Sequence, residues 1–502
     1  MTAVPKATRR EWIGLAVIAL PCLLYSMDLT VLNLAVPRLS AALRPSSAEL
    51  LWIIDIYGFL VAGSLITMGT LGDRIGRRRL LLIGAAAFGA ASVAAAVSQS
   101  ATMLIVTRAL LGFAGATLAP STLSLIRNMF LDEHQRRVAI GVWVTSYSVG
   151  GAIGPLVGGI VLEHFWWGSV FLIGVPVMVL LLIVGPLLLP EYRDPKAGRL
   201  DILSAVLSLG AVLAVIYGLK RIAEHGPGWP AAVAIIAGAV LGIVFVRRQQ
   251  QLSDPLIDTR LFQSAAFSAS LALYMIATLI AFGAYIFLAQ HLQLVLGLSP
   301  FKAGLATIPS MLAFVAGSLL VPLIVRRVRP ASVIVAGLVL AAAGFVVLSY
   351  AAESAGLGAL IAGSLIYSLG ISPVVILATD FIVGSAPVEK AGAASAISET
   401  SSELGGALGI AILGSIGIAV YRSAMGDAVL TGLLPAAAEA ARATLGGAVA
   451  VAEQLPDQLR GQVLGTARAA FASAFQLTAF ISAALALLLV PVARMLNPRK
   501  GL

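Results

Sequence analysis

The feature that most constrains this chain is a succession of apolar blocks, each about 20 residues long, separated by short polar connections. Of its 502 residues, 59% are hydrophobic and only 11% carry a charge. A soluble protein of this size carries about 25% charged residues, whereas about 20 apolar helical residues cross ~30 Å of hydrocarbon. The sequence therefore predicts an all-α membrane protein with many membrane-spanning helices.

Fourteen spans are predicted along the chain. They cover residues 12–36, 49–71, 80–98, 102–125, 138–161, 168–189, 201–220, 229–247, 265–289, 301–325, 331–350, 356–379, 391–420 and 470–493. Lys and Arg gather in both terminal tails and in the even-numbered connections, and cytoplasmic segments carry such an excess. We expect a multi-pass protein with both termini in the cytoplasm. The Ala-, Gly- and Val-rich composition is typical of a high-GC bacterium, and we expect the protein in the bacterial cytoplasmic (plasma) membrane.

The spans fall into five predicted regions. These are a six-helix N-terminal bundle (1–190), cytoplasmic linkers with two extra helices (191–264), helices 9–13 of a C-terminal bundle (265–422), an outer helical hairpin (423–469), and the last helix with a cytoplasmic tail (470–502). The extra pair carries few polar residues, so we expect it to lie outside the transport pathway. The loops 69–79 and 325–330 form an approximate repeat. Repeated halves with a site at their interface are typical of secondary transporters.

Several other classes of protein lack support in the sequence. The single cysteine, Cys22, allows neither a disulfide nor a Cys-based metal site. The four histidines fall in or beside predicted loops without ligand spacing, so no metal is expected. There is no P-loop, no zinc-protease motif, no nucleophile elbow and no repeated filter segment. The net charge of +10 is scattered between apolar blocks, so no nucleic-acid partner is expected.

The loop after the second span is the most specific motif, and it reads Gly-Thr-Leu-Gly-Asp-Arg-Ile-Gly-Arg-Arg-Arg over 69–79. It resembles the signature loop of the major facilitator superfamily. The alternative is an ordinary basic loop. The resemblance implies a latch that holds the two halves in the outward-facing state. Its residues are Gly69, Asp73, Arg74, Gly76, Arg77 and Arg78.

Two more segments narrow the resemblance. The fifth span carries Gly150, Gly154, Pro155, Gly158 and Gly159, which resembles the GxxxGPxxGG element of drug antiporters in that superfamily. As a bare pattern it is a small-residue packing face. The runs 28–37, 52–57, 298–304 and 392–405 resemble the fourteen-helix drug/proton antiporter branch, with pumps of the QacA, SmvA and LfrA type. The branch implies two six-helix bundles, two extra linker helices and an outer hairpin.

Three charged residues are predicted inside the outer half of the N-terminal bundle. At ~1.5 Å per residue, Asp28 lies about 12 Å deep, and Asp55 and Arg108 lie about 9 Å deep. A charge at this depth costs roughly 3 kcal/mol and marks a functional site by default. We expect Asp28 and Arg108 to interact and these three residues to couple protons to transport. A fixed structural ion pair, and a solvated or capping role for Asp55, are the alternatives.

A second acidic set lies in the thirteenth span. Glu399 and Glu403 are four residues apart and share one helix face. Two carboxylates so close resist ionising together, which suits exchange of a proton for a cation. They would face a loop or solvent if the helix began later. With Asp28, they are predicted to bind substrate. Aromatic rings can add cation–π contacts; the candidates are Tyr25, Tyr57, Tyr147 and Tyr285, although packing is the alternative for each.

These features predict a proton-coupled multidrug efflux antiporter without a cofactor, not an enzyme. The implied substrates are lipophilic cations such as quaternary ammonium compounds, ethidium and acridine dyes, with fluoroquinolones as a further class. QacA-type pumps for divalent cations carry an extra acidic residue where this chain has Phe314, which implies a preference for monovalent cations. The alternative is proton-coupled export of an endogenous metabolite, lipid or antibiotic. Protons, the bilayer and the substrate are the expected partners of a monomeric protein.

Overall fold

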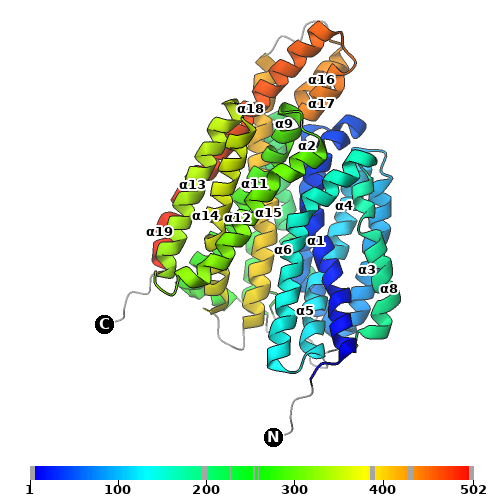
Figure 1. Cartoon of the computed structure of the whole chain (residues 1–502), viewed down its shortest axis with the longest axis vertical. Helices are drawn as coiled ribbons and strands as arrows, with labels where there is room; N and C mark the ends of the chain where they lie inside the picture. Colours follow the sequence, from blue (N-terminus) through cyan, green and yellow to red (C-terminus); the bar gives the residue numbers. More distant parts are fainter. Residues whose placement is uncertain are drawn as a thin grey trace.

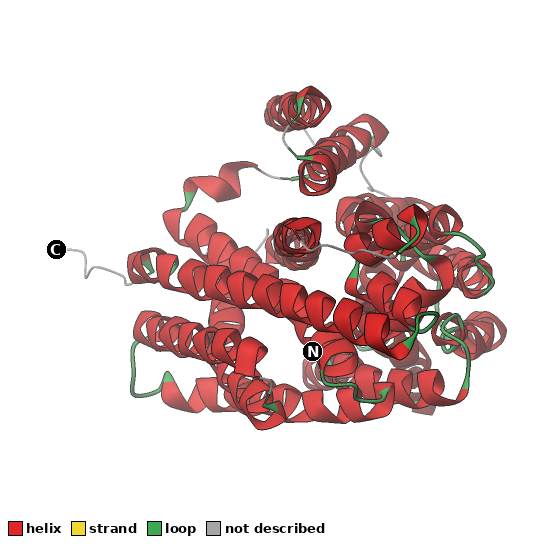
Figure 2. Cartoon of the chain, turned by 90° about the horizontal axis from the view of Figure 1, so that it is seen from above, coloured by secondary structure: helices red, strands yellow, loops and turns green. Residues whose placement is uncertain are grey.

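A computed structural model shows that the chain is built from helices, and its description covers residues 6–191, 193, 201–226, 228–252, 255–257, 259–354, 356–384, 391–427 and 433–496. Within these residues the ordered elements are all helical (Figures 1 and 2). Thirteen helices are long and apolar enough to cross a membrane, and the bent helix α6 is the fourteenth. The prediction of an all-α, fourteen-span protein is confirmed.

The first half of the fold comprises α1–α8, and the second half comprises α11–α19. The bounds in the first half are α1 Arg9–Leu43, α2 Ser47–Ile75, α3 Arg77–Ala96, α4 Ala101–Gly115, α5 Leu118–Met129, α6 Glu133–His164, α7 Ser169–Leu172 and α8 Val175–Leu188. The extra pair is α9 Ile202–His225 and α10 Trp229–Gln251, followed by the short 3₁₀ helix η1 Thr259–Gln263. In the second half they are α11 Ala265–Gln290, η2 His291–Val295, α12 Pro300–Ile324, α13 Pro330–Ser354, α14 Leu357–Gly384, α15 Ala391–Asp427, α16 Pro435–Ala443, α17 Leu445–Ala452, α18 Asp457–Leu488 and α19 Val490–Met495.

Several predicted spans differ from the helices that form. The span 102–125 is two helices, α4 and α5, with a break at Ala116–Thr117. Pro120 explains the break, because proline has no N–H and is tolerated only in the first turn of a helix. The span 168–189 also divides, into α7 and α8. Within the predicted hairpin 423–469, α15 continues to Asp427 and α18 begins at Asp457, with α16 and α17 between them.

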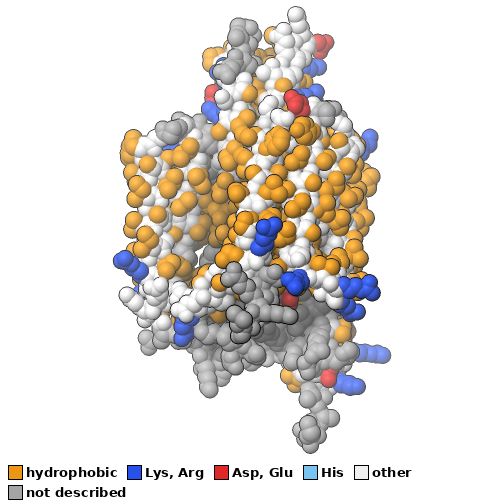
Figure 3. All heavy atoms as spheres, turned by 90° about the vertical axis from the view of Figure 1, so that its left-hand side faces the viewer, with side chains coloured by type: hydrophobic (Ala, Val, Ile, Leu, Met, Phe, Trp, Pro, Cys, Tyr) orange, Lys and Arg blue, Asp and Glu red, His pale blue; other side chains and the backbone are white. Residues whose placement is uncertain are grey.

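The short helices α16 and α17 lie together at one end of the bundle, beyond the main body of the spans (Figure 1). We call this the hairpin end. The first turn of α1 and the helix α19 lie toward the opposite end, which we call the terminal end. On the face that Figure 3 shows, apolar side chains cover most of the described surface between the two ends, and most of the charged groups lie toward those ends. This surface suits a hydrocarbon environment.

The two halves pack mainly through two helix pairs, α2 with α15 and α6 with α12, and α1 also contacts α11, α12 and α17. Glycines allow the close approach. A Cβ on Gly159 would lie 2.8 Å from the Phe301 backbone, and one on Gly414 would lie 2.7 Å from the Leu51 side chain. Gly58 packs on Ala407 near the middle of the same seam. These contacts between halves lie from the middle of the bundle toward the hairpin end, so the halves are sealed there.

The extra helices α9 and α10 pack mainly against each other, and α9 also contacts both α2 and α15. Ile216 of α9 is buried with Phe59 of α2 and Ala407 of α15. The pair therefore covers the outside of the seam between the two halves. Its predicted position outside the transport pathway stays a prediction, as does the five-region division of the chain.

Candidate transport site

The buried charge of the N-terminal half is an ion pair. The Arg108 guanidinium of α4 donates to the Asp28 carboxylate of α1 at 2.7 Å. Only 1% of the Arg108 side chain and 16% of the Asp28 side chain are exposed. The contact that the sequence predicted between these two residues is confirmed. Whether it couples protons to transport stays a prediction.

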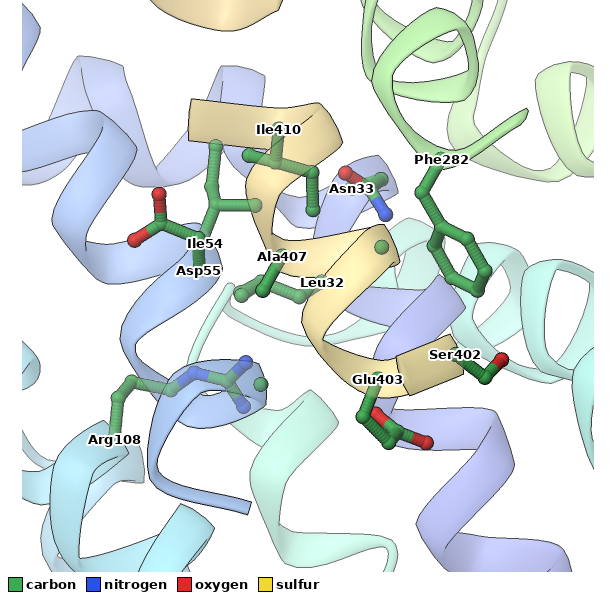
Figure 4. Close-up of a pocket in the computed structure, with 12 residues that line it drawn as sticks. Leu32, Asn33, Ile54, Asp55, Arg108, Phe282, Ser402, Glu403, Ala407 and Ile410 are labelled. Atoms are coloured by element: carbon green, nitrogen blue, oxygen red, sulfur yellow. The ribbon is translucent and has the colours of Figure 1, made fainter. Parts of the chain in front are cut away.

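The surroundings of Arg108 hold its guanidinium in one place. Its Nε donates to the Ile53 carbonyl at 3.2 Å, and the Tyr57 ring lies 4.6 Å from the guanidinium carbon. Asp55, between these two α2 residues, is also buried, with 1% exposed. Its carboxylate is turned away from Glu403 (Figure 4). The structure thus brings Asp28 and Arg108 into contact and places Asp55 on the adjacent helix.

A cavity lies between the halves beside this ion pair, and we call it the central cavity. It is lined by Leu32, Asn33, Ile54, Asp55, Gly58, Arg108, Phe282, Ser402, Glu403, Gly406, Ala407 and Ile410. Arg108 and Glu403 enter it from opposite sides (Figure 4). Its volume of about 40 Å³ holds a few water molecules, whereas sites for drug-sized ligands have about 300–1,000 Å³. The site is therefore contracted in this state.

The C-terminal half contributes two carboxylates, both from α15. Glu403 of α15 is half-buried, and its hydrogen-bonding neighbour is the Tyr25 hydroxyl of α1. Glu399, one turn closer to the terminal end, is exposed. Among the described residues, no Lys or Arg forms an ion pair with either carboxylate. Both lie on the predicted helix, which begins at Ala391, so the alternative of a later helix start is wrong.

Aromatic rings connect the two acidic regions in one continuous series. Trp143 packs on Tyr147 with 4.8 Å between ring centroids, Tyr147 on Tyr25 at 5.8 Å, and Tyr25 on Tyr57 at 6.1 Å. The series ends at Tyr57, beneath the Arg108 guanidinium. We call these four rings the aromatic series. Both glutamates are near enough to Tyr147 to act on it electrostatically, so a lipophilic cation would meet ring faces and carboxylates together.

Three of the four predicted tyrosines, Tyr25, Tyr57 and Tyr147, belong to the aromatic series, but Tyr285 does not. Its polar neighbours are Thr307 and Tyr367 within the C-terminal half, and it does not line the central cavity. Sequence reasoning missed other lining residues, notably Asn33 and Ser402. Asn33 follows Asp28 by five residues in the same helix, so its position within an apolar span was a usable signal.

The predicted antiporter motif packs α6 directly on the helix that carries Asp28. A Cβ on Gly158 would lie 2.7 Å from the Val31 side chain, and Gly150 and Gly154 meet the α1 backbone and Thr30. The same motif faces the other half, where Gly159 contacts Phe301. Pro155 also touches α12, at Gly304. One short segment therefore joins α1 to the seam between the halves.

The predicted latch residues that are described make contacts within the N-terminal half. Arg77 donates to the Pro120 carbonyl at 3.3 Å. The Arg78 backbone N–H donates to Glu191 at 3.1 Å, and its guanidinium donates to the Leu189 carbonyl at 3.0 Å. Gly76 has φ of 112°, and a Cβ there would meet the Glu191 carboxylate. Gly69 approaches Pro120, Arg74 is exposed, and the Asp73 side chain lies outside the described part.

One histidine departs from the sequence expectation. His291 was expected beside a loop, but it is fully buried in the π-helical turn η2 that ends the span of α11. Its ring packs against Phe471 and Phe475 of α18. The span continues past its predicted end at residue 289, which brings His291 inside. Among the described residues, no group of three His, Cys, Asp or Glu side chains could hold a metal ion.

Comparison with known proteins identifies relatives over nearly the whole chain. The "Multidrug efflux pump LfrA" of Mycolicibacterium smegmatis is 45% identical over 486 residues, covering 96% of each chain. The "Methyl viologen resistance protein SmvA" of Salmonella typhimurium is 39% identical over 478 residues, covering 92% of this chain and 93% of that protein. The "Tetracenomycin C resistance and export protein" of Streptomyces glaucescens is 31% identical, covering 96% of this chain and 91% of that protein.

Solved structures share the fold at low sequence identity. A bacterial homolog of the human lysosomal transporter Spinster, in an inward-facing and unoccupied conformation, has a TM-score of 0.67 at 17% identity. The match covers 99% of this chain and 100% of that one. The family model described as Major Facilitator Superfamily matches residues 18–410. This chain therefore belongs to the major facilitator superfamily of membrane transporters, and its similar relatives include drug efflux proteins.

Proposed function

We propose that this protein is a proton-coupled antiporter that exports lipophilic, mainly monovalent cations, including quaternary ammonium compounds, ethidium and acridine dyes, with fluoroquinolones as a further class. The observation that carries the proposal is Glu403, a carboxylate at a contracted cavity between the halves, without a basic partner and beside the aromatic series. A cation can supply the missing charge. The relatives described as multidrug efflux and resistance proteins support export of foreign compounds.

The direction of coupling follows from the charges around the central cavity. When Asp28 is ionised it neutralises Arg108, and a cation is held by Glu403 and Glu399. When a proton binds Asp28, the guanidinium is left uncompensated beside the same cavity. Its positive charge then opposes the bound cation, because like charges repel strongly where the dielectric constant is low. One proton entering therefore favours one cation leaving, and no cofactor takes part.

The orientation belongs to this proposal. We place the terminal end in the cytoplasm of a bacterial cell and the hairpin end outside, with the protein monomeric in the plasma membrane. The excess of Lys and Arg in the predicted cytoplasmic connections supports this placement. With the halves sealed at the hairpin end, the site in this state would be reached from the cytoplasm.

The test is ethidium efflux from vesicles or proteoliposomes with an imposed pH gradient. A protonophore should abolish efflux by the wild-type protein. Asp28→Asn should lose gradient-driven efflux by about ten-fold or more and should bind ethidium more weakly, because a neutral side chain leaves the Arg108 guanidinium uncompensated as a proton on Asp28 does. Asp380→Asn, the same chemical change at an exposed position of α14, is the matched control. Normal gradient-driven efflux by folded Asp28→Asn would overturn the role of Asp28.

Substrate charge separates this proposal from export of a neutral metabolite, lipid or antibiotic. Ethidium efflux should be inhibited by other lipophilic cations more strongly than by uncharged compounds of similar size and hydrophobicity. Equal inhibition by the uncharged set would contradict the assignment of a cation site.

A further inference from the structure

A second cavity follows the central one along the seam between α2 and α15, toward the hairpin end. We call it the hairpin-side cavity. Its walls are Leu50, Leu51, Ile54, Ile286, Phe287, Gln290, Gly414, Gly417, Ile418, Tyr421, Ala443, Thr444, Leu445 and Phe471. Ile54 lines both cavities. The two spaces are therefore in series, with the side chain of one α2 residue between them.

Side chains packed on glycine keep the hairpin-side cavity small, at about 40 Å³. Leu51 of α2 fits against Gly414 of α15, where a Cβ would come within 2.7 Å of it. Phe287 of α11 fits against Gly417 so closely that a Cβ there would overlap the ring. Since Leu51 belongs to one half and Gly414 to the other, separating the halves at this end would open the cavity.

The helices α16 and α17 cover the side of the cavity that faces the hairpin end. Ala443, Thr444 and Leu445 at their junction line it. Two hydrogen bonds fix the junction, since the Ser47 hydroxyl donates to the Ala443 carbonyl and the Tyr421 hydroxyl donates to the Ala441 carbonyl at 2.8 Å. The cavity is thus enclosed between the central site and the outer surface.

The chemistry of the hairpin-side cavity differs from that of the central one. It contains no charged side chain, whereas Asp55, Arg108 and Glu403 line the central cavity. Its few polar groups are already engaged. Tyr421 bonds Ala441, the Thr444 hydroxyl accepts from the Gly447 N–H at 2.9 Å, and the Gln290 amide bonds its own helix. What remains is apolar and aromatic surface, including Phe287 and Phe471.

We propose that the hairpin-side cavity is a second, release-side binding site that takes the apolar alkyl or aryl part of the exported compound. This inference rests on the proposed export function. A cation that moves past Ile54 loses its carboxylate but keeps apolar contact, so it is held weakly and leaves when α2 and α15 separate. The glycines at positions 414 and 417 allow the emptied site to close.

A cross-link across the cavity tests the route. Leu51→Cys and Gly414→Cys are combined in a Cys22→Ser background, and the two thiols are bridged with a short bifunctional reagent. Efflux of ethidium should fall by about ten-fold or more, because opening at this end is blocked. Ethidium binding from the terminal end should change less than about two-fold, and both measurements are compared with the same double-cysteine protein before it is bridged. Undiminished efflux by the cross-linked protein would overturn the inference.

A second variant tests the ligand class. Phe287→Ala enlarges the cavity, so the efflux rate of long-chain alkyltrimethylammonium ions should change at least about three-fold more than that of tetramethylammonium-sized headgroup analogues. Equal changes for both would overturn the assignment of apolar ligands. Failure of the wild-type protein to export any of these cations would instead overturn the proposed function, so the two failures are distinguishable.

Discussion

The two halves of the molecule treat buried charge in opposite ways. In the N-terminal half, Asp28 is neutralised by Arg108 at 2.7 Å, and the guanidinium makes a further hydrogen bond and lies against an aromatic ring. In the C-terminal half, the Tyr25 hydroxyl lies beside Glu403, Glu399 is exposed, and no described Lys or Arg forms an ion pair with either carboxylate. Arg108, Asp55 and Glu403 line the same central cavity between the halves.

The difference separates two tasks that a single carboxylate would perform poorly. A charge that is paired and hydrogen-bonded within the protein is stable there, and removing one partner is costly. A carboxylate without an internal partner is poised to accept one from outside. We infer that the N-terminal pair responds to protons while the C-terminal carboxylates meet the cargo. Three predictions test this division, from the largest expected effect to the smallest, and a fourth concerns an ion pair outside the spans for comparison.

Arg108→Ala is expected to have the largest effect, because it leaves the Asp28 charge buried without compensation. Breaking a buried pair in this way costs about 3–5 kcal/mol. The apparent melting temperature in detergent should fall sharply, and efflux should be lost. The double variant Asp28→Asn/Arg108→Ala should recover much of the stability but none of the proton coupling. If the double variant were no more stable than the single one, the pairing argument would fail.

Glu403→Gln should act on transport and not on folding. Interactions with a charged group contribute about 1.5–3 kcal/mol, so apparent affinity for cations should fall about 10–150-fold. The melting temperature should stay the same or rise, since a partly buried carboxylate without a basic partner is removed. Ethidium binding and thermal unfolding, measured on the same preparation, check both parts. A loss of stability as large as that of Arg108→Ala would remove the contrast between the halves.

Tyr147 should contribute through its ring. Its hydroxyl makes no hydrogen bond of good geometry, the Cys22 thiol being its polar neighbour. Tyr147→Phe should therefore transport ethidium as the wild-type protein does. Tyr147→Ala removes a cation–π contact of about 0.5–2 kcal/mol, which corresponds to a loss of affinity of about 2–30-fold. Equal apparent affinities of the two variants for ethidium, measured by titrating efflux, would contradict a contact between the Tyr147 ring and the cation.

The smallest effect is expected at Asp201, outside the membrane spans. Arg248 donates to both of its carboxylate oxygens at 3.0 Å and lowers its pKa to about 2. Because the folded pKa lies below the ordinary value of about 3.9, the stabilisation is present above that value and is lost only as the pH falls through about 2. Asp201→Asn should cost about 0–1 kcal/mol, equally at pH 5 and pH 8. Thermal unfolding at both pH values checks this, and a pH-dependent difference would contradict it.

Much of the fold could be predicted because membrane-spanning helices are specified locally. A run of about 20 apolar residues satisfies its own backbone hydrogen bonds in lipid whatever its neighbours are, so fourteen spans could be counted. The limits were less predictable. Apolar composition did not indicate that α4 ends at Gly115 or that α18 begins at Asp457, since proline position and packing at the hairpin end decide those limits.

The candidate site was predictable in part for the same reason. Asp28 and Arg108 could be matched by depth, because helical rise converts a residue number into a height. Depth does not give the angle around the bundle. For that reason Tyr285 was placed in the site although it faces Thr307 and Tyr367, and Asn33 was overlooked although it lines the central cavity.

The sequence by itself determined the class of the protein, its spans and which charged residues lie within them, since a charged residue inside an apolar run can be seen in the sequence alone. Only the tertiary structure decided which charges are paired. Helices α1 and α4 are separated by more than fifty residues, yet close helix packing brings Asp28 to Arg108, whereas no described Lys or Arg forms an ion pair with Glu403. That difference depends on distances between helices, which no local pattern contains.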